Sequence, residues 1–157
     1  MIYIYTDGGC WPNPGNGAWA IAVVHHNELI YKECHAEEGI STNNICEIKA
    51  ILKALYISLK ISGTVIIKSD SQYAINSITK WAESWKKNGW KKKGGEIKNL
   101  ELIKEANAIW QQQKDRVDIV WVKGHNGNKW NELCDELCAK AISEAEKDNI
   151  IKRIYNT

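Results

Sequence analysis

Four acidic residues that lie far apart in the chain stand where their side chains could meet. Asp7 and Asp70 each end a segment with strand character, and Glu47 and Asp135 lie at the edges of two amphipathic helical patterns. Ligand sites of open α/β sheets lie at the carboxyl ends of strands. If the four carboxylates converge, each pair repels by about 3 kcal/mol at ~5 Å and an effective dielectric constant of ~20. A fold keeps such a cluster only where it binds a cation.

The chemical type of these side chains indicates which cation. Carboxylates without accompanying histidine or cysteine pairs favour a hard ion such as Mg²⁺ or Mn²⁺. Two such ions about 4 Å apart are the usual machinery for in-line attack of water on a phosphodiester. The acidic set therefore favours metal-dependent hydrolysis of a phosphodiester bond.

Three of the four acids also have a structural explanation, which the sequence leaves open. Asp70 could cap a helix that begins at Ser71, because aspartate is a favoured N-cap residue. Glu47 stands three residues after Asn44, which is the spacing of a capping box. Asp135 could be a solvated residue at the flank of its helix. Only convergence of the whole set favours the chemical explanation over these.

Hydrophobic periodicity indicates the elements that must position the acids. Alternation over 1–7 predicts a strand, and the Gly, Pro and Asn residues of 8–17 predict a turn. Residues 18–26 and 29–35 then predict two strands joined near Asn27. The first third of the chain is therefore expected to form an antiparallel meander.

After the meander, helical patterns alternate with strand patterns. The expected elements are a helix over 41–63, a strand over 64–70, weaker helical segments after Asp70, a helix over 99–113, a strand over 116–122 and a helix over 129–147. This order predicts an α/β fold in which helices pack on the faces of a mixed sheet. We expect one domain over 1–148 and assign no structure to 149–157.

Length and composition fit a single globular domain. A chain of 157 residues with 44% hydrophobic and 25% charged residues can bury a core without disulfides. No stretch approaches the ~18 apolar residues that span a bilayer, and "MIYIYTDGG" has no secretory leader pattern. We therefore expect a cytoplasmic protein without membrane contact. Five scattered cysteines form no CxxC pair, which favours buried reduced thiols over a zinc site.

Positive charge is concentrated in one segment, residues 80–98. Seven lysines stand there against two acids, a local charge of +5 in a chain whose net charge is only +2. Trp81 and Trp85 are four residues apart and would share one helical face. Lysines at a surface are usually only solvated, but interleaved tryptophans favour a groove that follows a nucleic-acid backbone. Trp90 fits such a face or the core equally well.

Several sequence blocks, in one order, resemble a known family. They are "YTDGGC" followed by "NPG", "TNN" before Glu47, "SDSQY", the spaced tryptophans ending in "NGW", "VKGH" and "NELCDELCAKA". Together they resemble the type 1 ribonuclease H family, of the bacterial stand-alone kind, over about residues 1–145. The resemblance implies a five-stranded mixed sheet, with strands 1–3 antiparallel, strands 4 and 5 added in parallel, and helices on both faces. It also implies a monomeric endonuclease that hydrolyses the RNA strand of RNA–DNA hybrids and leaves 3′-hydroxyl and 5′-phosphate ends.

The resemblance also assigns roles to single residues. Asp7, Glu47, Asp70 and Asp135 would bind two Mg²⁺ ions, with Mn²⁺ as a substitute. His125 would assist proton transfer or product departure, although most loop histidines do neither. The implied substrate contacts are Cys10, Asn13, Thr42, Asn43, Asn44, Gln72, Trp81, Trp85, Lys86, Lys87, Asn99 and Asn131. Amide side chains both donate and accept, as recognition of a 2′-hydroxyl requires, but the same asparagines could simply form turns and helix caps.

Three positions depart from the family pattern, and two other functions remain open. Gly9 stands where the family usually has serine, Cys46 replaces a larger apolar residue, and Trp130 replaces a polar one. None of these removes an expected metal ligand. A transposase- or integrase-like DNA nuclease, or a domain of a reverse transcriptase, would share the acidic cluster. A hybrid-binding module without catalysis would keep salt-sensitive binding but show no turnover.

Overall fold

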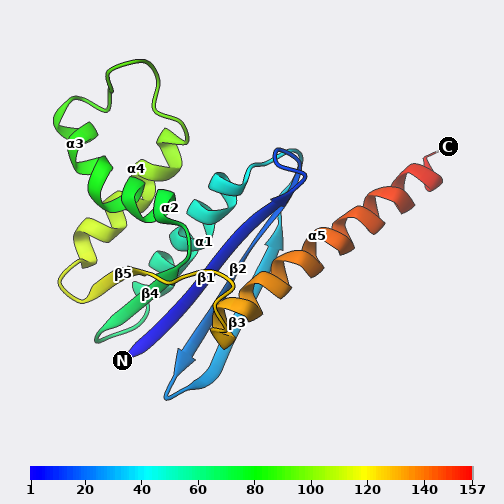
Figure 1. The fold of residues 1–157 in the computed structure, drawn as a ribbon, viewed down its shortest axis with the longest axis horizontal. Helices are drawn as coiled ribbons and strands as arrows, with labels where there is room; N and C mark the ends of the chain where they lie inside the picture. Colours follow the sequence, from blue (N-terminus) through cyan, green and yellow to red (C-terminus); the bar gives the residue numbers. More distant parts are fainter. Residues whose placement is uncertain (157) are drawn as a thin grey trace.

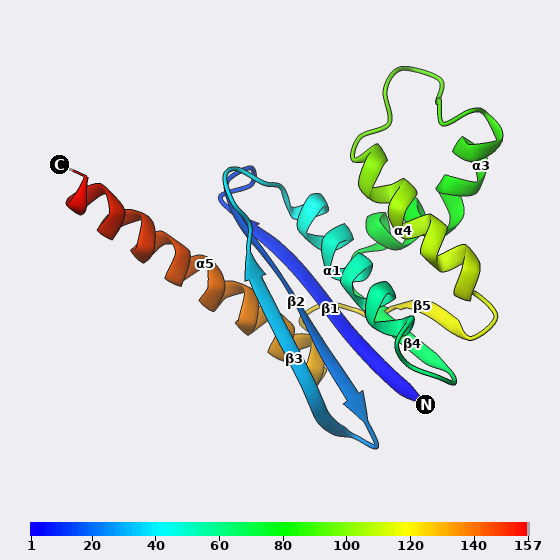
Figure 2. The same ribbon diagram turned by 180° about the vertical axis from the view of Figure 1, so that it is seen from behind.

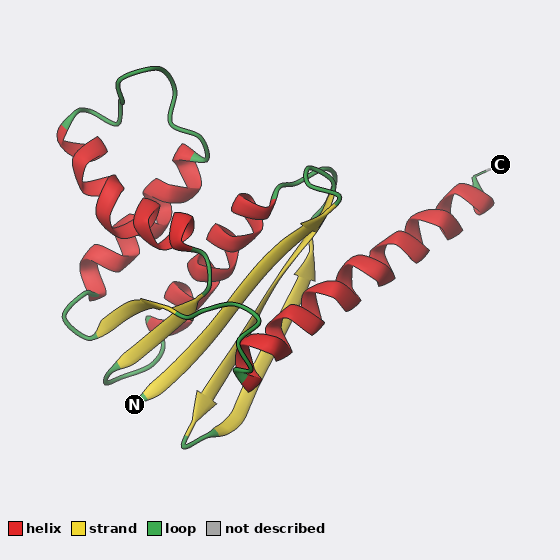
Figure 3. Cartoon of the chain, in the orientation of Figure 1, coloured by secondary structure: helices red, strands yellow, loops and turns green. Residues whose placement is uncertain are grey.

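The centre of the molecule is a five-stranded mixed sheet (Figure 3). A computed structural model describes residues 1–156 of the chain. The strands are β1 (Ile2–Trp11), β2 (Asn16–His25), β3 (Glu28–Ala36), β4 (Val65–Ser69) and β5 (Val117–Trp121), in the order β3-β2-β1-β4-β5. β1, β2 and β3 are antiparallel neighbours, whereas β4 runs parallel to β1 and β5 parallel to β4. The predicted fold class is confirmed.

Helices cover both faces of this sheet (Figures 1 and 2). Along β1, Ile4 contributes to a core with helix α1 (Asn43–Ser58), and the next residue, Tyr5, contributes to a core with helix α5 (Lys129–Tyr155). Successive side chains of a strand point to opposite faces, so α1 and α5 lie on opposite sides. The remaining helical segments are α2 (Gln72–Asn76), the π-helical turn η1 (Ser77–Trp81), α3 (Ala82–Lys87) and α4 (Leu100–Gln113).

The turn that was predicted for 8–17 is much shorter in the structure. β1 continues to Trp11, with Gly8 paired to Trp19 and Cys10 paired to Gly17 in β2. The turn is left with only four residues, 12–15. The prediction was wrong because it took all the glycines as turn residues, whereas Gly8 and Gly17 are strand residues whose missing side chains leave room for Cys46 at the start of α1.

The last helix is longer than predicted. It was expected to end near residue 147 but extends to Tyr155, so 149–155, left unassigned, is helical. Its first turns pack on the sheet through Trp130 and Leu133, whereas Ile150 and Ile151 near its end are exposed. The end of α5 projects beyond the sheet in Figures 1 and 2. The apolar side chains that face the sheet stop before the helix ends. The sequence pattern therefore predicted a helix that is too short.

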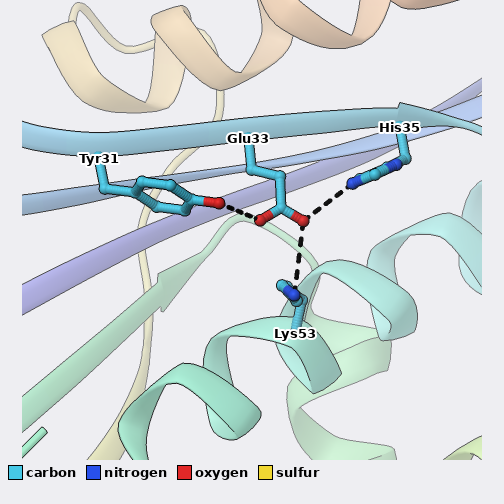
Figure 4. Close-up of polar contacts among 4 residues, drawn as sticks. All are labelled: Tyr31, Glu33, His35 and Lys53. Carbon is cyan, nitrogen blue, oxygen red and sulfur yellow. Dashed lines mark hydrogen bonds and ion pairs between the residues drawn. The ribbon is translucent and has the colours of Figure 1, made fainter. Parts of the chain in front are cut away.

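A polar cluster connects the edge strand β3 to α1 (Figure 4). The carboxylate of Glu33 accepts hydrogen bonds from the Tyr31 hydroxyl at 2.6 Å and pairs with His35 Nε2 at 2.9 Å and Lys53 Nζ at 3.5 Å. Partial burial raises the pKa of Glu33, but Tyr31, His35 and Lys53 outweigh it, so the pKa lies below its ordinary value. Lys49 of α1 pairs with Glu37 beside this cluster. These contacts attach the helix that carries Glu47 to the sheet.

Within residues 1–156, no helix has the length and apolar character needed to cross a membrane.

Candidate active site

Three of the four predicted carboxylates meet at one edge of the sheet. One oxygen each from Asp7, Glu47 and Asp70 can be chosen so that all three lie within 4.8 Å of one another. Asp7 lies in β1, Glu47 near the start of α1, and Asp70 directly after β4. The prediction that Asp7 ends its strand is wrong, because β1 continues to Trp11. The two aspartates still lie close together, because β1 and β4 run parallel and each aspartate stands two residues beyond the last pair of their ladder, Tyr5 and Lys68. Asp7 and Glu47 are each only 7% exposed, and Asp70 is half-buried.

Gly8 joins two of these carboxylates through its backbone. Its N–H lies 3.0 Å from Asp7 Oδ1 and 2.6 Å from Glu47 Oε1. A Cβ atom at this position would lie 2.3 Å from the backbone carbon of Cys46 and 2.4 Å from the nitrogen of Glu47. Only glycine therefore lets α1 approach β1 closely enough for Glu47 to join Asp7.

The electrostatics of the cluster favour a bound cation. Burial, together with repulsion by Asp70 and Asp135, raises the pKa of Asp7 to about 7, although the hydrogen bond with Glu47 acts to lower it. Burial likewise places the pKa of Glu47 well above its ordinary value, and burial raises the pKa of Asp70. Glu47 Oε2 is buried without a hydrogen-bond partner among the described residues. A buried acceptor of this kind is costly unless it meets a proton or a metal, and an oxygen-only ligand set fits a hard divalent ion.

Asp135 and His125 lie at the rim of this cluster. Asp135 is exposed on α5 and stands outside the close group of three, but its charge contributes to the raised pKa values of Asp7 and Asp70. A cavity of about 320 Å³ lies between α5 and the end of β1, with Asp135, Cys10 and Trp11 in its wall. His125 is exposed in the loop after β5, with a φ of 54°, and is near enough for its positive charge to lower the pKa of Asp70.

The capping explanations for two of the acids are wrong. The side chain of Thr42 caps α1 by accepting a hydrogen bond from the Ile45 N–H at 3.2 Å, so the capping box from Asn44 does not form. Ser71 caps α2 by accepting from the Ala74 N–H at 3.1 Å. The carboxylates of Glu47 and Asp70 are therefore not used as N-caps.

Several predicted substrate residues surround the carboxylates. The Cys10 N–H donates to Asn43 Oδ1 at 2.8 Å, and the Asn43 N–H donates to Asn13 Oδ1 at 3.1 Å. These contacts join the β1–β2 turn to the start of α1, where Asn44 is exposed. Gln72 is exposed two residues after Asp70. By contrast, Asn131 is only 5% exposed in the first turn of α5.

The predicted basic segment, residues 80–98, includes α3 and the loop before α4, and is called the basic lobe below. The rings of Trp81 and Trp85 have centroids 6.1 Å apart, and Trp81 also contacts the ring of Tyr73. Asn99 Nδ2 donates to the Tyr73 hydroxyl at 3.2 Å. Lys86 and Lys87 are exposed at the end of α3, and Trp90 packs partly against the core.

Two residues near Asp70 were missed by the sequence analysis. A Cβ atom at Gly124 would lie 2.6 Å from Asp70 Oδ2, and Trp121 Nε1 donates to the backbone carbonyl of Asp70 at 3.2 Å. The available signal was weak, since Gly124 only precedes His125 in a glycine-containing loop.

The zinc alternative finds no support in the described residues, where the close group of three carboxylates is the one candidate metal cluster. Four of the five cysteines are buried, as expected.

The sheet order and the acidic cluster define an α/β protein of the ribonuclease H-like fold class. The family model for RNase H matches residues 1–143. The chain therefore belongs to the ribonuclease H family, and it is a nuclease of the hydrolase class.

Individual relatives agree with this assignment, and solved structures agree with the fold. Ribonuclease H of Wolbachia pipientis wMel is 39% identical over 145 residues, which cover 92% of this chain and 97% of the relative. Ribonuclease H of Francisella tularensis subsp. novicida (strain U112) is 42% identical over 144 residues, or 91% of each chain. The solution structure of the PFV RNase H domain matches with a TM-score of 0.78 at 25% identity, over 90% of this chain and 94% of that domain. LC11-RNase H1, crystallised with an RNA/DNA hybrid, matches with a TM-score of 0.69 at 22% identity, over 92% and 99%.

Proposed function

We propose that the protein is an endoribonuclease that hydrolyses the RNA strand of RNA–DNA hybrids and leaves 3′-hydroxyl and 5′-phosphate ends. The observation that carries the proposal is the close group of Asp7, Glu47 and Asp70, with a buried Glu47 oxygen that lacks a partner. The family membership, and a fold neighbour crystallised with an RNA/DNA hybrid, support the substrate class. The enzyme would act as a monomer in the cytoplasm, with catalysis in residues 1–148.

The proposed metal ligands are Asp7, Glu47, Asp70 and Asp135, which would hold two Mg²⁺ ions, or Mn²⁺ in their place. Bound ions of this kind supply a nucleophilic water and stabilise the charge that develops on the phosphate. Gly8 orients two of the ligands through one N–H. Asp135, which is exposed at the rim of the cluster, would complete the set from the solvent side.

The substrate would lie over the carboxylates and reach the basic lobe. Asn13, Asn43 and the Cys10 backbone are already connected by hydrogen bonds, so they present a pre-formed polar surface beside Asp7. Asn44 and Gln72 extend this surface, and their amides can both donate to and accept from a ribose 2′-hydroxyl. Thr42 and Asn99 would bind a phosphate of the DNA strand. Asn131 would support the region near the cleaved bond.

The basic lobe would hold the DNA strand through its backbone. Trp81 and Trp85 offer ring faces, and Lys86 and Lys87 offer exposed positive charge. His125 would accept or deliver a proton near Asp70, or assist departure of the product, from its exposed loop.

Substitution of Asp70 tests the proposed mechanism. We expect Asp70→Asn to abolish hybrid cleavage in Mg²⁺, at least a hundredfold, because a neutral amide is a much weaker ligand for a hard cation. Hybrid affinity and melting temperature should remain close to those of the wild type. The measurement uses a labelled hybrid, with product ends mapped by ligation and phosphatase treatment. The control is Glu132→Gln, which removes an exposed acid of α5 outside the cluster.

The same assay separates the other candidate functions. Near wild-type turnover by Asp70→Asn would refute the proposed role of this carboxylate. Cleavage of duplex DNA in preference to the hybrid would indicate a DNA nuclease. Salt-sensitive hybrid binding without turnover in Mg²⁺ or Mn²⁺ would indicate a binding module.

A further inference from the structure

The end of β5 holds the backbone around Asp70. Trp121 pairs with Ser69 at the last position of the parallel ladder, and the Val122 N–H donates to the Ser69 carbonyl at 2.8 Å. One residue beyond the ladder, the indole Nε1–H of Trp121 donates to the Asp70 carbonyl at 3.2 Å. Backbone hydrogen bonds of the sheet restrain the chain as far as Ser69. The indole hydrogen bond extends this restraint by one residue, to Asp70.

Asp70 is the carboxylate of the close group that most needs such a restraint. Asp7 lies inside the β1–β2 ladder opposite Ala20, and Glu47 lies inside α1. Asp70 lies between the end of β4 and the start of α2, outside both elements. Within its own segment the turn is held by the Ser71 N–H, which donates to Ser69 Oγ at 3.0 Å, so the contacts from β5 add to a limited local restraint.

The loop after β5 also meets Asp70. The position of a Cβ on Gly124 lies only 2.6 Å from Asp70 Oδ2, so the loop backbone passes directly against the carboxylate. The indole of Trp121 thus holds the Asp70 peptide, while the Gly124 backbone limits where its oxygens can go. Trp121 is 46% exposed, so core packing does not account for a tryptophan here.

We propose that Trp121 is a positioning residue for the metal ligand Asp70, acting through the hydrogen bond from its indole to the Asp70 carbonyl. The inference rests on the proposed function, because it takes Asp70 to bind Mg²⁺. Trp121 itself contacts neither the metal nor the substrate in this role. It sets the orientation of a ligand that does.

Trp121→Phe tests the inference, because phenylalanine keeps an aromatic ring and removes the N–H donor. Mg²⁺ binding is measured without substrate, by NMR titration of backbone amides such as that of Gly8. We expect roughly fivefold weaker Mg²⁺ binding, which is the factor that one neutral hydrogen bond is worth. In cleavage assays the half-saturating Mg²⁺ concentration should rise by the same factor, high Mg²⁺ should restore kcat, and the KM for hybrid should stay unchanged.

Trp110→Phe is the matched control. The Nε1 of Trp110 is buried and has no hydrogen-bond partner among the described residues, so losing it should not change Mg²⁺ binding. Wild-type Mg²⁺ affinity in Trp121→Phe, or equal weakening in both variants, would overturn the inference. If the wild-type protein binds no Mg²⁺ and cleaves no hybrid, the proposed function itself fails, and the positioning role fails with it.

Discussion

At the scale of single residues, the buried carboxylate of Asp7 should lower stability while it serves catalysis. Burial and the charges of Asp70 and Asp135 raise its pKa to about 7, above the value near 3.8 expected in the unfolded chain. The folded state therefore binds more protons than the unfolded state between these two values. It follows that the free energy of unfolding decreases as the pH rises from about 4 to about 7, as long as no metal is bound.

Asp7→Asn should remove this dependence. In EDTA, we expect the melting temperature of the wild-type protein to fall between pH 5 and pH 8 more steeply than that of the variant. At pH 8 the variant should melt a few degrees higher, since 1 kcal/mol shifts the midpoint by about 2–4 °C for a chain of this size. Hybrid cleavage should be lost. A variant less stable than wild type at pH 8, measured by circular dichroism, would contradict the raised pKa.

The sequence predicts the identity of the carboxylates better than their local surroundings. Asp70 does follow a strand end, which is read from a short apolar pattern, whereas Asp7 lies inside β1 and not at the strand end that the sequence predicts. The caps do not follow, because the run 41–44 offers four capping side chains and 69–71 offers three. Backbone conformation selects among them, as at Thr42, where φ is −135° and ψ is 160°. No periodic pattern encodes that choice.

At the scale of elements, the close approach of α1 to β1 forms half of the candidate site. Composition alone suggests a turn at Gly8, but the structure shows a strand residue whose missing side chain admits the backbone of Cys46 and Glu47. This contact joins two residues, Gly8 and Glu47, that are 39 positions apart in the chain. It could be predicted only after the layers of the fold were known.

Gly8→Ala should separate the two ligands. The added methyl group would overlap the backbone of α1, and overpacking of this kind typically costs about 1–3 kcal/mol. We expect the melting temperature to fall by several degrees and hybrid cleavage to drop at least tenfold, because Glu47 is displaced from Asp7. Gly9→Ala is the stability control, since a Cβ there meets nothing within 4 Å. Equal melting temperatures for both variants would show that the approach of α1 is not restrictive.

At the scale of the whole molecule, charge is divided between two regions. Residues 80–98 carry a net +5, whereas the whole chain carries only +2, so the remainder is net acidic. In Figure 1 the basic lobe, which contains α3, lies at one end of the molecule, and the end of α5 lies at the other. The carboxylates lie between them, on the sheet edge. A polyanion would be attracted by the lobe and would meet the acidic site only where cations neutralise it.

The salt dependence of hybrid binding should therefore depend on the lobe. Each lysine that neutralises a phosphate contributes about 0.9 to the slope of log K against log salt for B-form DNA. We expect the double variant Lys86→Gln/Lys87→Gln to bind hybrid more weakly at low salt and to reduce this slope by roughly 1–2, with kcat at saturating hybrid unchanged. The matched control, Lys147→Gln/Lys152→Gln, removes the same charge from exposed positions near the end of α5. If both double variants change the slope equally, net charge governs binding; an unchanged slope in the lobe variant would mean that these lysines only solvate the surface.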